Sequence, residues 1–102
     1  MNNLDTIFSS ATNSQKSAIK IIRISGNECN KIPEIFFFKP TKPREATLRK
    51  LYDSNKNIID NAIVIFFPGP YSVTGEDVFE IHTHGSVVIE KKIYHSLAKR
   101  KK

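Results

Sequence analysis

Two charged residues stand in apolar segments and are the first candidates for chemistry. Arg23 shares alternate positions with Ile19 and Ile21 in an isoleucine-rich segment, and Glu80 stands between two apolar residues. A charge in an apolar strand is costly unless it is paired or used. The residues therefore predict one of two arrangements. In the first, Arg23 pairs with Glu80 or reaches the edge of the sheet. In the second, they form a ligand site: the carboxylate accepts two N–H groups from a pterin-like or guanine-like ring edge, and the guanidinium binds an anionic group.

Three further side chains could act as metal ligands or nucleophiles. His82 and His84 are separated by one residue, so on a strand they share a face, and Glu80 or Asp77 could supply a third metal ligand. We favour ordinary hydrogen-bonded histidines, because no other ligand cluster recurs at suitable spacing. Cys29 has no activating base nearby in the sequence and is expected to be a small residue on a helix face. We predict neither a catalytic residue nor a metal site.

The segment Gly69–Asp77 contains the highest density of glycine, proline and hydroxyl residues in the chain. Its two glycines suggest a phosphate loop, but a Walker A motif requires Lys and then Ser or Thr after the second glycine. Here Glu76 follows Gly75, and its carboxylate would repel phosphate. We therefore expect no GTP or ATP site in this chain.

Length and composition limit the class of protein. The chain has 102 residues, 39% hydrophobic and 25% charged, which fits one globular domain with one modest core. No apolar run approaches the roughly 18 residues needed to span a bilayer, so a membrane protein is excluded. The polar start lacks the pattern of a secretory signal, and a single cysteine suits a reducing cytoplasm.

The net charge of +6 is a weak indication of nucleic-acid binding. Four of the sixteen positive charges lie in residues 99–102, which we expect to be a disordered basic tail. The other basic cluster, between Lys39 and Lys50, has no interleaved aromatic residues that could stack on bases.

Hydrophobic patterning predicts the elements that must position these residues. Pro33 makes the start of the first helix short or irregular, and Pro40 and Pro43 end it. The resulting order, ββαβββα, implies an α+β domain with two helices packed on a mixed β-sheet. The expected strands are Thr6–Phe8, Ala18–Ser25, Ala46–Tyr52, Ile58–Phe67 and Asp77–Thr83. The first helix is expected to start at Glu28, and the second to run from Ser86 to Lys99.

Two motifs, in this order along the chain, resemble the amino-terminal domain of the tRNA-modification GTPase family MnmE, also called TrmE. They are Ile-Ile-Arg-Ile-Ser-Gly at 21–26 and Phe-Pro-Gly-Pro-Tyr-Ser-Val-Thr-Gly-Glu-Asp-Val at 67–78, followed by Glu80 and His84-Gly85. The resemblance runs from residue 5 to about residue 97, so we expect the domain over 1–98. It implies a fold similar to the tetrahydrofolate-binding domain of the aminomethyltransferases, and a domain that forms a homodimer.

The same resemblance implies a ligand, a tetrahydrofolate derivative such as 5-formyl- or 5,10-methylenetetrahydrofolate. It carries the folate contacts onto Arg23 and Glu80. The pocket would be lined by residues of the long motif, namely Ser72, Thr74, Gly75 and Glu76. This chain departs from the family at residues 15–18, where the family has a glycine-rich turn, and at Ser86, which replaces a second glycine.

In the family, a helical domain and a G domain that uses GTP, Mg²⁺ and K⁺ follow this domain. Together with the flavoprotein MnmG, the whole enzyme modifies C5 of the wobble uridine in tRNA, and folate supplies the one-carbon unit. We expect no GTPase activity from this chain alone and a cytoplasmic location. Two alternatives remain: a small basic RNA-binding protein that uses residues 39–50 and the tail, and a degenerate dimerisation domain in which Arg23 and Glu80 form an internal ion pair.

Overall fold

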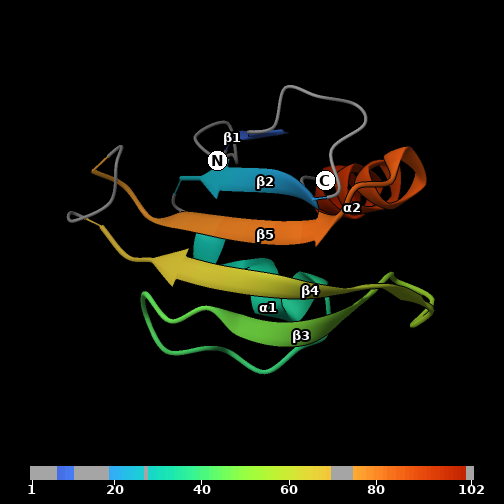
Figure 1. Cartoon of the computed structure of the whole chain (residues 1–102). Helices are drawn as coiled ribbons and strands as arrows, with labels where there is room; N and C mark the ends of the chain where they lie inside the picture. The colour runs from blue at the N-terminus through green and yellow to red at the C-terminus, as the bar shows by residue number, and fades with distance from the viewer. Residues whose placement is uncertain (1–6, 11–18, 27, 70–74, 101–102) are drawn as a thin grey trace.

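The computed structural model of the chain describes residues 7–10, 19–26, 28–69 and 75–100. Five strands form one sheet in the order β1-β2-β5-β4-β3, and each neighbouring pair is antiparallel (Figure 1). The predicted α+β class and element order are confirmed. The elements are β1 (Ile7–Ser10), β2 (Ile19–Ser25), a 3₁₀ turn η2 (Cys29–Lys31), α1 (Ile32–Ile35), β3 (Thr47–Tyr52), β4 (Ile58–Phe67), β5 (Val78–His84) and α2 (Val87–Arg100).

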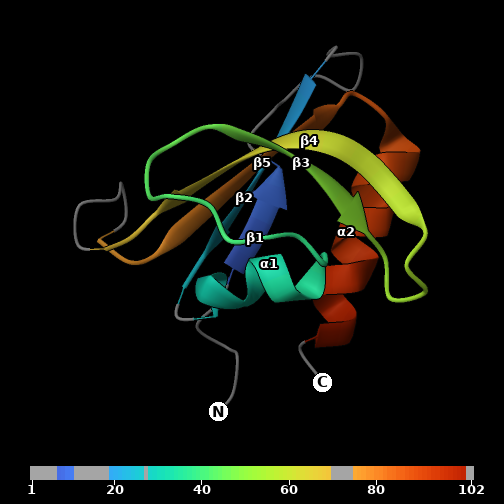
Figure 2. The same ribbon diagram turned by 90° about the horizontal axis from the view of Figure 1, so that it is seen from below.

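Both helices lie on the same side of the sheet, as Figure 2 shows. The strands bury alternate residues beneath them, because successive strand side chains point to opposite faces. In β5 the alternate residues Phe79, Ile81 and Thr83 are buried, as is Val78 at the start of the strand, and α2 contributes Ile93 and Leu97 to the same core. We call the opposite side the open face; it carries the remaining alternate residues of β2 and β5.

Helix α1 is short for local reasons. The first turn from Cys29 is 3₁₀, and Pro33 stands at the start of the α-helix, as expected from its missing N–H group. The helix ends before Phe37, which has a φ of 60°. This is the left-handed conformation that often follows a helix, and glycine is the residue that usually adopts it. The N–H of Phe38 donates to the Pro33 carbonyl (3.0 Å) across this end.

A tight turn joins β3 to β4. The Oδ1 atom of Asp53 accepts hydrogen bonds from the N–H groups of Asn55 and Asn57, both at 2.9 Å. Such a carboxylate replaces backbone partners inside the turn. Residues 53–57 therefore form the hairpin turn between these two paired strands.

Helix α2 begins after Ser86, whose hydroxyl accepts a hydrogen bond from the Ile89 N–H at 3.3 Å, and it continues through Lys99 and Arg100. Residues 99 and 100 of the expected tail are thus part of α2, and residues 101–102 lie outside the described residues. Neither helix in the described ranges has the length and apolar character needed to cross a membrane.

Candidate functional site

Arg23 and Glu80 lie directly opposite each other on β2 and β5. The Nε and Nη2 atoms of Arg23 lie 3.0 and 2.8 Å from the same carboxylate oxygen, Oε2 of Glu80. The structure therefore brings the two predicted residues together as an ion pair. The pair is not buried among apolar residues, as the sequence suggested. It lies on the open face while Ile22 and Ile24 face the core, and the Arg23 side chain is 43% exposed.

His82 holds the other oxygen of the same carboxylate. Its Nε2 atom lies 2.9 Å from Oε1 of Glu80, so both carboxylate oxygens have a partner. Burial alone would raise the pKa of Glu80, but the hydrogen bonds and positive charges of His82 and Arg23 outweigh it and lower that pKa. Sequence reasoning weighed His82 as a metal ligand and favoured an ordinary hydrogen-bonded histidine, but it did not place His82 in the site with Glu80. The signal that could have identified it is its position two residues after Glu80, which puts both on one strand face.

Three isoleucines flank this three-residue cluster on the neighbouring strands. Ile65 lies opposite Glu80 on β4, and His82 lies between Ile63 on β4 and Ile21 on β2. All three isoleucines are half-buried. Apolar walls beside an ionised carboxylate and a partly exposed guanidinium suit a flat ligand with apolar faces and N–H groups along one edge.

The long glycine-containing motif approaches the same end of β2. The Ser25 hydroxyl donates to Oε1 of Glu76 at 3.4 Å, and the Gly26 N–H donates to the Asp77 carbonyl at 3.0 Å. Gly75 has a φ of 81°, which a residue with a Cβ rarely adopts. Of the four predicted pocket residues, Gly75 and Glu76 therefore lie next to β2. Residues 72 and 74 lie outside the described residues.

The described residues at the two ends of the motif lie close enough together to require glycine at a second position. A Cβ at Gly69 would lie 2.7 Å from the Gly75 carbonyl oxygen, closer than side chains tolerate. The Gly69 N–H also donates to Oδ1 of Asp77 at 2.9 Å. The two ends of the motif are thus fastened to each other next to β5.

The remaining candidate residues have other partners. Nδ1 of His84 lies 2.9 Å from Oδ1 of Asp60, away from the Glu80 cluster, and the described ranges contain no group of three side chains placed to hold a metal ion. Burial, reinforced by the charge of Asp77, raises the pKa of the Cys29 thiol to about 12. A thiol in this state is a poor nucleophile, which agrees with the predicted packing role.

Three cations of the basic segment between residues 39 and 50 have separate surroundings. The Nε atom of Arg49 donates to the Lys39 carbonyl at 3.3 Å, and the Arg44 guanidinium lies 5.9 Å from the centre of the Phe67 ring. Lys50 follows Arg49 on β3 and therefore projects to the opposite face.

Comparison with known proteins places this arrangement in a family. The model for the family described as GTP-binding protein TrmE N-terminus matches residues 6–102. The tRNA modification GTPase MnmE of Wolbachia sp. subsp. Drosophila simulans (strain wRi) is 48% identical over 99 residues, covering 96% of this chain and 22% of the relative. The protein of the same name from Anaplasma marginale (strain St. Maries) is 41% identical over 98 residues, covering 95% and 22%.

A third relative, the tRNA modification GTPase MnmE of Buchnera aphidicola subsp. Schizaphis graminum (strain Sg), is 42% identical over 85 residues, covering 83% of this chain and 19% of its own length. The chain thus spans about a fifth of the length of the relatives it matches. A family match over residues 6–102, together with these identities, shows that the chain belongs to the TrmE amino-terminal family.

Proposed function

We propose that this chain is a tetrahydrofolate-binding and dimerising module of a cytoplasmic tRNA-modification GTPase. The observation that carries the proposal is the cluster of Arg23, Glu80 and His82 on a sheet face walled by isoleucines. The GTPase activity, the tRNA substrate and a flavoprotein partner belong to the proposal for the whole protein, of which this chain matches about a fifth.

The donors and acceptors of the cluster suit a reduced pterin. The lowered pKa of Glu80 keeps the carboxylate ionised at neutral pH, so it acts only as an acceptor. Each carboxylate oxygen has two acceptor positions, and Arg23 fills both on Oε2 while His82 fills one on Oε1. One ring N–H group can therefore bind Oε1 beside His82, and a second binds Oε2 when Arg23 gives up one of its two contacts. Bound folate would supply a one-carbon unit to the tRNA base.

Arg23 has capacity for a second contact. A guanidinium carries five N–H donors, and Arg23 directs two of its three nitrogen atoms at Glu80. Because its side chain is 43% exposed, the other donors can reach a carbonyl or carboxylate of the folate. His82 would keep the Glu80 carboxylate in one orientation.

The open face also supports the proposed homodimer. Ile19 is 57% exposed and Leu48 is 56% exposed, and they stand on β2 and β3, on either side of the candidate site. Large apolar side chains exposed on a sheet face are candidates for burial against a second copy.

The ion pair itself favours a second candidate function, a degenerate domain that binds no ligand. Arg23 and Glu80 already satisfy each other, as the pair in such a domain would. The two functions differ in what the cluster binds, so ligand titration separates them.

The test is calorimetric titration of the chain with 5-formyltetrahydrofolate, with the oligomeric state measured by light scattering on the same samples. Wild type should bind saturably, and Arg23→Ala and Glu80→Gln should each weaken binding at least about tenfold, which corresponds to one lost charge-assisted hydrogen bond. Glu45→Gln, an exposed carboxylate in the loop before β3, is the charge-matched control and should bind as wild type. No binding by folded wild type would support the degenerate domain.

A further inference from the structure

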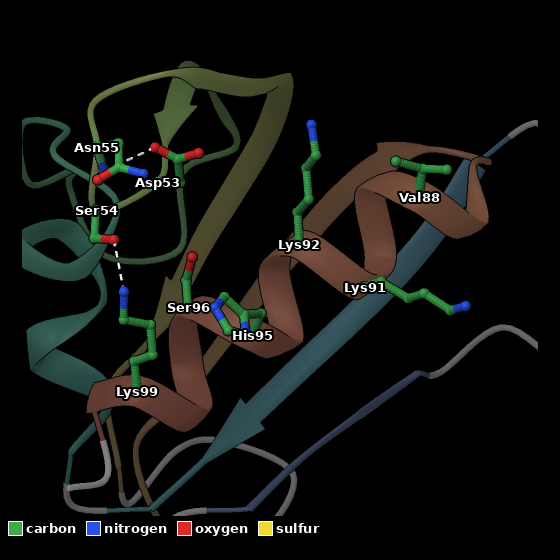
Figure 3. Close-up of a pocket in the computed structure, with 9 residues that line it drawn as sticks. All are labelled: Asp53, Ser54, Asn55, Val88, Lys91, Lys92, His95, Ser96 and Lys99. Carbon is green, nitrogen blue, oxygen red and sulfur yellow. Dashed lines mark hydrogen bonds between the residues drawn. The ribbon is translucent and has the colours of Figure 1, made fainter.

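A basic groove lies on the helix side of the molecule, between α2 and the turn that joins β3 to β4 (Figure 3). It encloses about 300 Å³. Its positive charge comes from one side of α2 and its hydroxyl and amide groups from the turn. The residues that line it include Lys91, Lys92, His95 and Lys99 of α2, and Ser54 and Asn55 of the turn. We call this cavity the α2 groove.

The groove brings together distant parts of the chain at one defined contact. Nζ of Lys99 donates to the Ser54 hydroxyl at 2.9 Å, which joins the end of α2 to the turn. An ammonium group has three donors, so two remain for a ligand. Figure 3 shows Lys91 and Lys92 extending from the helix without touching the other labelled side chains.

Two acidic residues lie in or near the groove, and both have partners. Glu90, the one acidic residue of α2, pairs with Lys20 at 3.4 Å. Asp53 lines the turn side of the groove and keeps its negative charge there, and its Oδ1 atom accepts two backbone N–H groups of the turn. Within the described part of the chain, no carboxylate forms an ion pair with Lys91 or Lys92.

The stability of the helix does not account for this charge. Cations near a helix C-terminus interact favourably with the helix dipole, which explains Lys99. Lys91 and Lys92 lie between the first and the last turn of α2, where the effect of the dipole has fallen off, so it does not account for them. Their ammonium groups are available to an external anion.

We propose that the α2 groove binds the phosphate backbone of RNA. The cations from Lys91 to Lys99 extend over about 12 Å of helix, at about 1.5 Å per residue, which matches a series of phosphates better than one isolated anion. The hydroxyl and amide of the turn add neutral donors of the kind that contact phosphate oxygens. RNA, rather than an acidic peptide, follows from the proposed tRNA-modifying function, on which this inference rests.

The surface differs from the basic segment singled out in the sequence. Between residues 39 and 50, Arg49 is held by a backbone carbonyl and Lys50 projects to the other face. In α2 the spacing of 92, 95 and 99 places three basic side chains along one stripe. This helical spacing gives the basic side of the groove, and the turn between β3 and β4 gives the other side.

The test is fluorescence anisotropy of a labelled, unmodified tRNA transcript titrated with the full chain between about 50 and 200 mM salt. The variant Lys91→Gln/Lys92→Gln/Lys99→Gln should bind about tenfold more weakly or worse, and its slope of log affinity against log salt should fall by about 2 to 3. The control Lys39→Gln/Lys42→Gln/Lys50→Gln removes the same charge from exposed positions outside the groove and should retain most of the slope. Circular dichroism verifies that both variants fold, and Lys92→Gln alone is the milder substitute.

Three results would overturn the proposal: no RNA binding by folded wild type, equal losses in the groove variant and its control, or stronger competition by polyglutamate than by unlabelled RNA. The last would identify an acidic protein segment as the occupant instead. Titration of the same samples with 5-formyltetrahydrofolate separates the two proposals. Folate binding without RNA binding defeats only the groove, and RNA binding without folate binding defeats only the folate site.

Discussion

The coupling between Arg23 and Glu80 can be measured by a double-mutant cycle, which asks whether the pair exists for stability or for a ligand. The variants are Arg23→Ala, Glu80→Gln and the double substitution. Both Arg23 contacts fall on a single oxygen, Oε2, so the pair lacks the two-oxygen geometry that makes arginine–carboxylate pairs strong. The 43% exposure of Arg23 further reduces the electrostatic interaction by solvent screening.

We therefore expect a coupling free energy of about 1 kcal/mol, the upper part of the range for exposed pairs and below that of a buried pair. The assay is urea denaturation of the four proteins, followed by circular dichroism and analysed for the free energy of unfolding. The ligand proposal adds that folate binding falls much more than stability in the same variants. A coupling above about 3 kcal/mol, the value for breaking a buried pair, would refute this reasoning and make the pair a structural element.

Three further predictions concern other groups. Glu90→Gln should destabilise the fold by about 2–4 kcal/mol because it leaves the buried Lys20 ammonium unpaired, whereas Lys20→Met/Glu90→Gln, which removes both charges, should recover most of that loss; urea denaturation measures both. The lowered pKa of Glu80 contributes stability that is present above its ordinary value of 4.5 and is lost as the pH falls through the folded value, so acid titration of unfolding should show this loss in wild type but not in Glu80→Gln. Cys29, with its pKa near 12, should resist iodoacetamide at pH 8 until the chain is unfolded in urea; rapid labelling of the native chain would contradict its burial.

The strands and helices could be predicted from the sequence because their patterns are local. The face of β2 could not, since isoleucines occupy both sets of alternate positions, at 19 and 21 and at 22 and 24. The buried face proved to be the one carrying Lys20, whose partner Glu90 lies on a helix 70 residues later. Periodicity cannot reveal such a partner.

The site was only partly predictable for a related reason. Arg23 and Glu80 stood out as misplaced charges, but their opposition depends on the register between β2 and β5, which no short segment determines. His82 entered the cluster through the same register and its shared face with Glu80. The α2 groove requires the docking of the β3–β4 turn against the helix, which the spacing of basic residues on α2 does not encode.

The pairing of β2 with β5 has a consequence for the order of folding. The hairpins β3–β4 and β4–β5 join neighbours in the chain, whereas β2 must find a partner whose residues lie 53 to 65 positions later. Closing so long a loop is slow relative to forming local contacts. During synthesis β2 must therefore wait for β5 to emerge, and Arg23 meets Glu80 only when the sheet is completed. The proposed binding site is then among the last parts of the domain to form, so ligand binding reports completed folding.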